Sequence, residues 1–132
     1  MKKKITVTAV PEPKLSKNAR RSLNEHVEAK LIKGSREEAF ILSRNEIIRI
    51  ERESYGKWKE LEKCKLKAKY FYSNSPPDYD GLACMIAPIV DGMVDAGIMK
   101  DDNPRVILDY MMEVEKVPHR NMRRVEITVS KV

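Results

Sequence analysis

Alternating apolar and polar residues predict four β-strands in this chain of 132 residues. The alternation is clear in Ile5–Ala9 and Cys64–Tyr72, and it recurs around residues 106–114 and 125–129. Successive side chains of a strand point to opposite faces, so each segment offers one apolar face to a core. The basic loop 118–124 between the last two segments predicts a hairpin.

A helical pattern of apolar residues lies between the first two strands. Residues 23–32 are weakly helical, and Gly34 is expected to break them. Ser35 and Glu38 then form a capping box, in which each side chain bonds a free backbone N–H of the first turn. A helix is therefore predicted from Ser35 to about Tyr55.

A second helix is predicted from about Gly81 to Ala96. Seven of its residues fall on one apolar stripe: Leu82, Met85, Ile86, Ile89, Val90, Met93 and Val94. Pro88 removes one backbone hydrogen bond inside it, and Gly97 is suited to a left-handed cap. Strands and helices in this order predict an α+β fold, with one small domain over residues 1–132 and a mixed β-sheet flanked by helices.

The composition is that of a globular protein, with 42% hydrophobic and 35% charged residues. No apolar run approaches the roughly 20 residues that span a bilayer, and no signal peptide is evident, so a cytoplasmic location without a membrane is expected. The two cysteines and two histidines fit neither a disulfide framework nor a zinc site. The net charge of +6 favours contact with phosphate backbones without establishing it.

The second strand concentrates positive charge on one face. Lys63, Lys65, Lys67 and Lys69 share that face because the side-chain period is two. They are either a solvated face that discourages aggregation or a row that contacts phosphates. The 118–124 loop is also basic, with His119, Arg120, Arg123 and Arg124.

Two carboxylate clusters flank the predicted second helix. Asp78 and Asp80 lie just before it, and Asp101 and Asp102 follow it. In an extended segment the Asp-x-Asp side chains point to the same side, and their oxygens suit Mg²⁺. The structural alternative is that Asp80 caps the helix and Asp78 favours the turn after Pro77.

Together these segments resemble the RusA-like Holliday junction resolvases, which phages and prophages often carry. The resemblance covers roughly residues 70–110. It lies in the Asp-x-Asp segment Pro77–Leu82, in a helix ending at Gly97, and in the pair Asp101–Asp102 before a strand. It implies an α+β fold and a homodimeric, phage-encoded or prophage-encoded enzyme in a bacterial host. Such an enzyme cuts four-way DNA junctions with Mg²⁺ or Mn²⁺ and needs no small-molecule cofactor.

The resemblance also implies residue roles. Asp78, Asp80 and Asp102 are the expected catalytic metal ligands, with Asp101 as a neighbour or alternate. The expected DNA contacts come from the lysine row, the acidic loop and the basic loop: Lys65, Lys67, Lys69, Lys100, Arg120, Arg123 and Arg124.

Two positions depart from the family pattern. Gly81 stands where the family has asparagine, and Cys84 stands where it has a lysine one turn after the second aspartate. A thiol cannot supply that positive charge, so Lys67, Lys69 or Lys100 is a candidate substitute. Two rival functions follow: a branched-DNA-binding homologue with weak or no cleavage, and a non-enzymatic protein-interaction module using the charged segment Arg44–Lys63.

Overall fold

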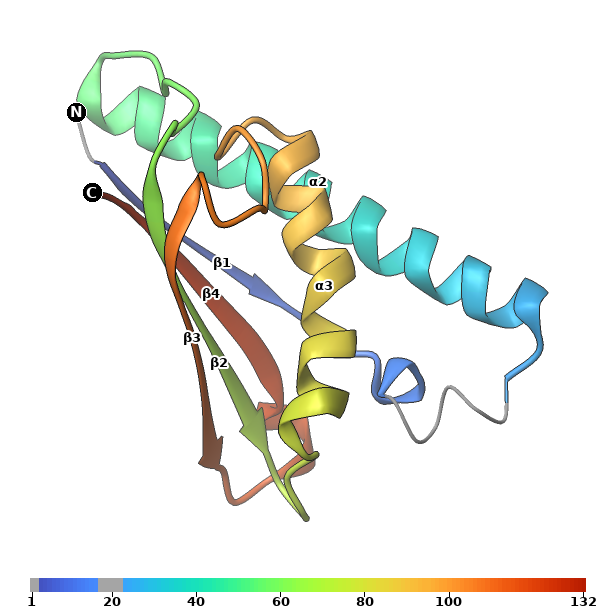
Figure 1. Cartoon of the computed structure of the whole chain (residues 1–132). Helices are drawn as coiled ribbons and strands as arrows, with labels where there is room; N and C mark the ends of the chain where they lie inside the picture. Colours follow the sequence, from blue (N-terminus) through green and yellow to red (C-terminus); the bar gives the residue numbers. More distant parts are fainter. Residues whose placement is uncertain (1–2, 17–22) are drawn as a thin grey trace.

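The computed structural model describes residues 3–16 and 23–132, and it confirms an α+β fold with a mixed sheet (Figure 1). Four strands form the sheet: β1 (Lys4–Ala9), β2 (Cys64–Tyr72), β3 (Ile107–Lys116) and β4 (Arg124–Lys131). The helices are α2 (Glu25–Ser54) and α3 (Tyr79–Asp95). Two short 3-10 turns accompany them, η1 (Pro13–Leu15) and η2 (Arg120–Met122).

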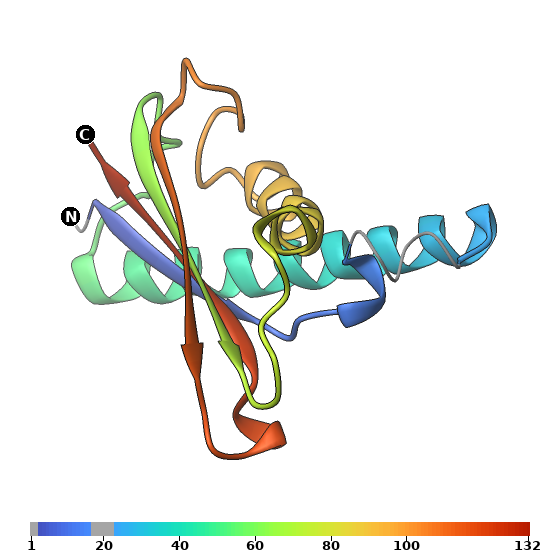
Figure 2. The same ribbon diagram turned by 60° about the horizontal axis from the view of Figure 1, so that its bottom comes forward.

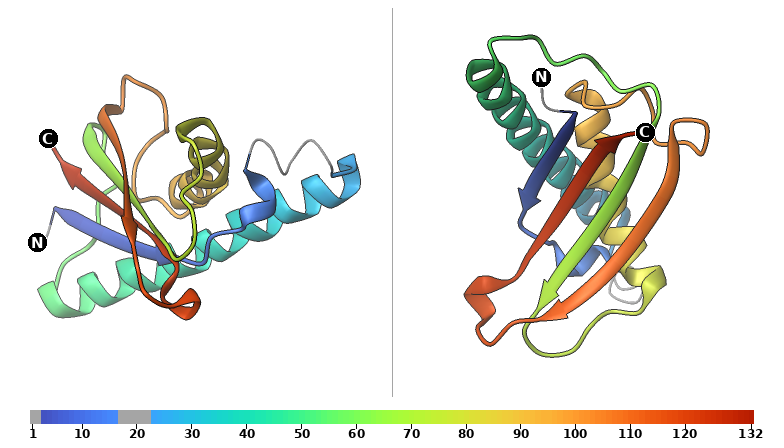
Figure 3. Two further views of the ribbon diagram at one scale, coloured as in Figure 1. Left: turned by 90° about the horizontal axis from the view of Figure 1, so that it is seen from below. Right: turned by 90° about the vertical axis from the view of Figure 1, so that its left-hand side faces the viewer.

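The strand order is β1-β4-β2-β3, so the predicted hairpin between the last two strands is wrong. Strand β2 lies between β3 and β4, parallel to the first and antiparallel to the second. After β3 the chain passes the end of β2, where the Val117 N–H donates to the Tyr72 carbonyl at 2.7 Å. Figure 3 shows this passage at one end of the sheet.

Both helices cover the same face of the sheet, which leaves the other face to solvent (Figure 2). The buried residues of β1, β2 and β4 alternate along the chain, as their pattern predicted. The alternation predicted for β3 is wrong: Ile107 alone is buried in this edge strand, and Leu108 and Tyr110 are exposed, because the helices make few contacts with it. On β2 the buried positions include Cys64, Leu66 and Ala68, whereas Lys65 and Lys67 are exposed. Burial on one side only is typical of a sheet that is not fully parallel.

Helix α2 is one uninterrupted helix of 30 residues, so the predicted break at Gly34 is wrong. Its N-cap is Asn24, whose side chain accepts from the Val27 N–H at 2.9 Å. A glycine inside a helix costs only about 1 kcal/mol, and packing of the later turns on the sheet outweighs that cost.

Helix α3 begins two residues earlier than expected and continues through Pro88. It packs closely on α2 at Gly92, where an added Cβ would lie 2.3 Å from the Arg36 carbonyl oxygen and 2.7 Å from the Ala39 Cβ. Gly97 has the expected positive φ of 87°. In the part of the chain that is described, no helix is long and apolar enough to cross a membrane.

Candidate functional site

The first pair of predicted metal ligands lies at the N-terminal end of α3. Asp78 is the N-cap residue, and its Oδ1 accepts from the Gly81 N–H at 2.7 Å. Asp80 lies in the first turn, where a carboxylate interacts favourably with the helix dipole. The cap is therefore Asp78, not the Asp80 that the sequence suggested.

The second pair lies beyond the opposite end of α3. A short bridge holds the chain there, because the Lys100 N–H donates to the Leu61 carbonyl at 2.9 Å and the Leu61 N–H donates to the Ile98 carbonyl at 3.0 Å. The Asp102 N–H then donates to the Asp101 carboxylate at 2.8 Å. That bond helps to fix the direction in which both carboxylates leave the loop.

Asp102 is in contact with a helix residue that the prediction did not include as a ligand. Loss of hydration raises the pKa of the Asp102 carboxyl, and hydrogen bonds with Asp101 and the charge of Asp91 raise it further. The pKa of Asp101 is lowered instead, mainly because its carboxylate accepts from the Asp102 N–H. Asp91, Asp101 and Asp102 thus form an acidic cluster at the C-terminal end of α3.

Two other residues reach this acidic cluster from distant parts of the chain. Arg36 of α2 binds Asp95 through two hydrogen bonds of 2.6 and 2.8 Å, and its positive charge also interacts with Asp91 and Asp102. Tyr110 is 43% exposed, but loss of hydration around its hydroxyl and the nearby Asp102 charge raise its pKa to about 12. Sequence reasoning missed both residues, since neither belongs to a motif around the aspartates.

The predicted three-carboxylate metal centre is not assembled within one chain. Asp80 and Asp91 are eleven residues apart on α3, which corresponds to about 16 Å at 1.5 Å per residue. Asp102 is beside Asp91, so Asp78 and Asp80 are too far away to share a cation with it. Among the described residues, no group of three His, Cys, Asp or Glu side chains could hold a metal ion. The length of α3, which separates the two motifs, is the physical reason.

Unpaired cations gather at the end of the sheet that is nearest Asp101. Three hollows of about 420, 390 and 280 Å³ lie there, and the first two share Lys63. The residues that line these hollows include fewer acidic than basic side chains. The acidic ones are Glu60, Glu62, Asp101 and Asp109. We define the basic rim as Lys3, Lys4, Lys59, Lys63, Lys65, Lys100, Arg105 and Lys131. Within the described chain, none of these side chains forms an ion pair with a carboxylate.

The predicted DNA contacts divide into three groups. Lys65 and Lys100 belong to the basic rim. Lys67 and Lys69 instead form ion pairs with glutamates of β3 at 3.2 and 3.1 Å. The remaining three, Arg120, Arg123 and Arg124, lie around η2 at the other end of the sheet, as the ribbon in Figure 3 shows.

Arg124 has a structural role that the sequence did not reveal. Its guanidinium lies 3.8 Å from the centre of the Phe71 ring and donates to Glu126 at 3.1 Å. Phe71 is on the lysine face of β2 but is only 5% exposed, because Arg124 covers it. This contact weakens the case for Arg124 as a DNA ligand.

Cys84 stands at the position where the resemblance leads one to expect a lysine, and it is half-buried on α3. A positive charge reaches the acidic cluster from another helix instead, because Arg36 of α2 interacts with Asp91 and Asp102.

Comparison with known proteins identifies no family. No family model matches the chain, and no curated protein matches it. Among solved structures, a putative translation initiation inhibitor from Salmonella typhimurium is similar, with 14% identity and a TM-score of 0.32. That match covers 98% of this chain and 83% of the other. A likeness this distant carries no argument about function.

Proposed function

We propose that this chain is a divalent-metal-dependent endonuclease that acts on branched DNA. One observation carries the proposal: a rim of cations that form no ion pair within the described chain adjoins a loop whose Asp102 carboxylate interacts with Asp91. The likeness of residues 70–110 to the RusA-like resolvases motivates the choice of a branched substrate.

The basic rim supplies the DNA-binding half of the proposal. Lysine ammonium groups without a carboxylate partner are free to replace the counterions of a phosphate backbone. Lys63 and Lys100 line the same hollow as Asp101, so a strand held by them passes close to the acidic cluster. Contacts of this kind position DNA without reading its sequence.

Asp91 and Asp102 supply the metal-binding half. Mg²⁺ commonly takes one or two protein carboxylates and completes its shell with water and substrate phosphate oxygens, so this pair fits it, whereas the predicted trio does not. Bound there, the cation would lower the pKa of a water molecule and stabilise charge on the phosphate. The repulsion that raises the pKa of Asp102 would also be relieved.

A second candidate function is binding of branched DNA without cleavage. The distance between Asp80 and Asp102 favours it, because the acids that the family pattern links are at opposite ends of α3. In that case the basic rim would still bind DNA, and the aspartates would serve as helix caps and loop supports.

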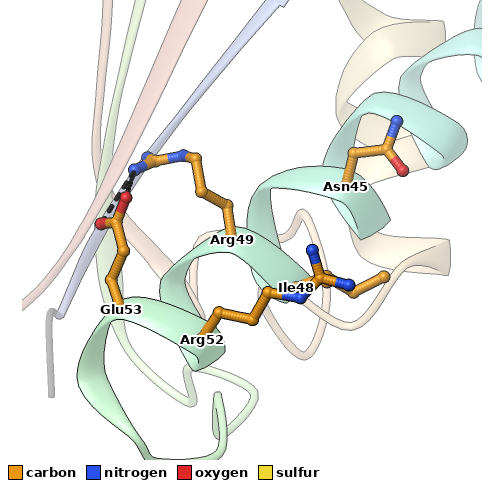
Figure 4. Close-up of a pocket in the computed structure, with 5 residues that line it drawn as sticks. All are labelled: Asn45, Ile48, Arg49, Arg52 and Glu53. Atoms are coloured by element: carbon orange, nitrogen blue, oxygen red, sulfur yellow. Dashed lines mark hydrogen bonds and ion pairs between the residues drawn. The ribbon is translucent and has the colours of Figure 1, made fainter.

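The test is an assay on a labelled four-way junction and on a matched duplex, with Mg²⁺, Mn²⁺ or EDTA. The proposal expects junction cleavage that requires metal and is lost in Asp91→Asn and Asp102→Asn. It expects cleavage to persist in the control variant Glu53→Gln, because Glu53 pairs with Arg49 on α2 and lies outside the acidic cluster (Figure 4). Junction binding without cleavage under both metals would establish the second candidate. Absence of binding at low salt would overturn both functions.

Asp80→Asn locates the site more finely. Persistent cleavage in this variant would place the reaction at the Asp91–Asp102 end of α3 alone. Loss of cleavage with normal folding and junction binding would show that the N-terminal acids also take part, and would contradict a centre built from Asp91 and Asp102 only.

A further inference from the structure

The open face of the sheet carries a hollow of about 280 Å³ at the end where β1 and β2 begin and β4 ends (Figure 3). Its lysines and hydroxyl residues lie on the uncovered face, because the alternate residues of the same strands are buried in the core. We call it the sheet hollow, and its polar lining is three lysines, two hydroxyl residues and one aspartate: Lys4, Lys65, Lys67, Thr128, Ser130 and Asp109. Positive charge therefore exceeds negative charge around it.

The register of the sheet fixes how these groups are arranged. Ser130 of β4 pairs with Lys4 of β1 on one side and with Lys65 of β2 on the other. Neighbouring strands are about 4.8 Å apart, so the Cα atoms of the two lysines are separated by about 10 Å. Lysine side chains are long enough for both ammonium groups to reach a single group placed over the Ser130 hydroxyl.

The donors at the centre of the sheet hollow have no partner of their own. Within the described chain, Lys4 and Lys65 form no ion pair, and the Ser130 hydroxyl forms no hydrogen bond. Thr128 differs, because its hydroxyl shares a hydrogen bond of 2.9 Å with the Thr6 hydroxyl. Two ammonium groups and one hydroxyl are thus available to an anion at the same place.

The side of the hollow next to β3 is less favourable for an anion. Lys67 is already paired with Glu113 at 3.2 Å. Asp109 lies opposite Lys65 in the register of β2 and β3, and its negative charge repels an anion. The favourable position is therefore over β4, between Lys4 and Lys65.

This arrangement of donors matches a phosphate monoester. At pH 7 a monoester carries a charge of about −1.5 to −2 and three strong acceptor oxygens. It can accept from two ammonium groups and a hydroxyl at once, in charge-assisted hydrogen bonds that are stronger than neutral ones. A phosphodiester within an unbroken strand carries a single charge and has fewer free oxygens, so the sheet hollow should prefer the end of a strand.

We propose that the sheet hollow binds the 5′-terminal phosphate of a nicked DNA strand. This inference rests on the proposed function, in which water bonds to the phosphorus as the bond to the 3′-oxygen breaks and that oxygen takes up a proton. Such a cut leaves a 5′-phosphate on one strand end and a 3′-hydroxyl on the other. Lys4 and Lys65 also belong to the basic rim, so a strand held along the rim lays its new end in the hollow, and the nicked product stays bound.

Fluorescence anisotropy on the full chain tests the site without cleavage. Two labelled nicked duplexes, identical except for a 5′-phosphate or a 5′-hydroxyl at the nick, are titrated in EDTA. Salt at about 0.15 M screens charges that are more than about 8 Å apart. The 5′-phosphate nick should bind about tenfold more tightly, and Ser130→Ala, Lys4→Gln or Lys65→Gln should each reduce that preference to about threefold or less. Equal affinity of the wild type for both nicks would overturn the proposal.

Lys59→Gln is the control variant, because Lys59 belongs to the basic rim but lines a different hollow. It should weaken the binding of both nicks alike and leave their ratio unchanged. A ratio that falls as far in Lys59→Gln as in Lys4→Gln would mean that net charge, and not the sheet hollow, causes the preference. That result contradicts the proposal.

Free phosphate compounds distinguish a DNA end from a small ligand of the same chemistry. Titrations with thymidine 5′-monophosphate and with inorganic phosphate can be followed by NMR at the backbone amides of Thr128 and Ser130. The nicked strand should bind at least about a hundredfold more tightly than either compound, because the basic rim holds it as well. Thymidine 5′-monophosphate that binds as tightly as the nick would rule out a DNA end as the ligand. Because the preference is measured in EDTA, its absence would leave the nuclease function standing.

Discussion

At the scale of single residues, Gly92 determines how closely the two helices approach. Its missing side chain lets α3 lie against the Arg36 carbonyl and Ala39 of α2. This contact also brings the Arg36 side chain to Asp95, at 2.6 Å. The geometry of the acidic cluster therefore depends on Gly92, which has no functional side chain.

We expect Gly92→Ala to lower the free energy of unfolding by about 2 kcal/mol, as overpacking does when backbone atoms must move. Urea unfolding at low protein concentration measures it. Gly34→Ala is the matched control: its Cβ would meet open space, and alanine favours a helix, so stability should rise by about 1 kcal/mol. A Gly92→Ala variant as stable as the wild type would show that the helices can separate without cost.

At the scale of elements, Asp78 has a role that does not involve a metal. Its carboxylate caps α3, so Asp78→Ala should cost about 1 kcal/mol of stability, and Asp78→Asn should cost little because asparagine also caps helices. Thermal unfolding without divalent ions separates this role from metal binding. Equal destabilisation by both substitutions would contradict the capping role.

The ion pair between Arg36 and Asp95 links α2 to α3, and its contribution to the free energy of unfolding should depend on pH. The guanidinium lowers the pKa of Asp95 in the folded chain, so this contribution is present above the ordinary aspartate pKa and is lost as the pH falls through the lowered value. Asp95→Asn should therefore reduce stability at pH 7, and its stability should approach that of the wild type as the pH falls below the lowered pKa of Asp95. Both side chains are more than a third exposed, so the effect will be small. A stability difference that does not change with pH would rule this linkage out.

The elements could be predicted from the sequence to the extent that their patterns are local. The period of two located all four strands, and the apolar stripe located α3. The continuation of α2 through Gly34 was missed, because helix packing on the sheet outweighs the propensity of one residue. The order β1-β4-β2-β3 was also missed, because chain neighbours β3 and β4 are separated in space by β2.

At the scale of the whole molecule, the candidate site could be predicted only in part. The sequence identified Asp101 and Asp102, but it grouped them with Asp78 and Asp80, which the length of α3 separates from them. Arg36 is 59 residues from Asp95 in the sequence, and no local pattern joins them. The lysines on one face of β2 also differ in role. Lys67 and Lys69 form ion pairs with glutamates of β3, whereas Lys65 does not.

That difference gives a prediction for DNA binding by the whole molecule. The double variant Lys59→Gln/Lys131→Gln removes two unpaired cations of the basic rim, and Lys67→Gln/Lys69→Gln removes two paired ones. Both change the net charge equally, so long-range attraction is matched. If the rim binds phosphates, the slope of log binding constant against log salt should fall by about two for the first variant and by less than one for the second.

Fluorescence anisotropy with a labelled junction, at a series of salt concentrations, measures both slopes. The comparison is decisive because each phosphate contact releases counterions locally, whereas a distant charge changes affinity with little effect on the slope. A larger fall for Lys67→Gln/Lys69→Gln than for Lys59→Gln/Lys131→Gln would place the DNA on the open face of the sheet, where Lys67 and Lys69 lie, and would remove the basic rim from the proposed function. Unchanged slopes for Lys59→Gln/Lys131→Gln would remove the basic rim as well.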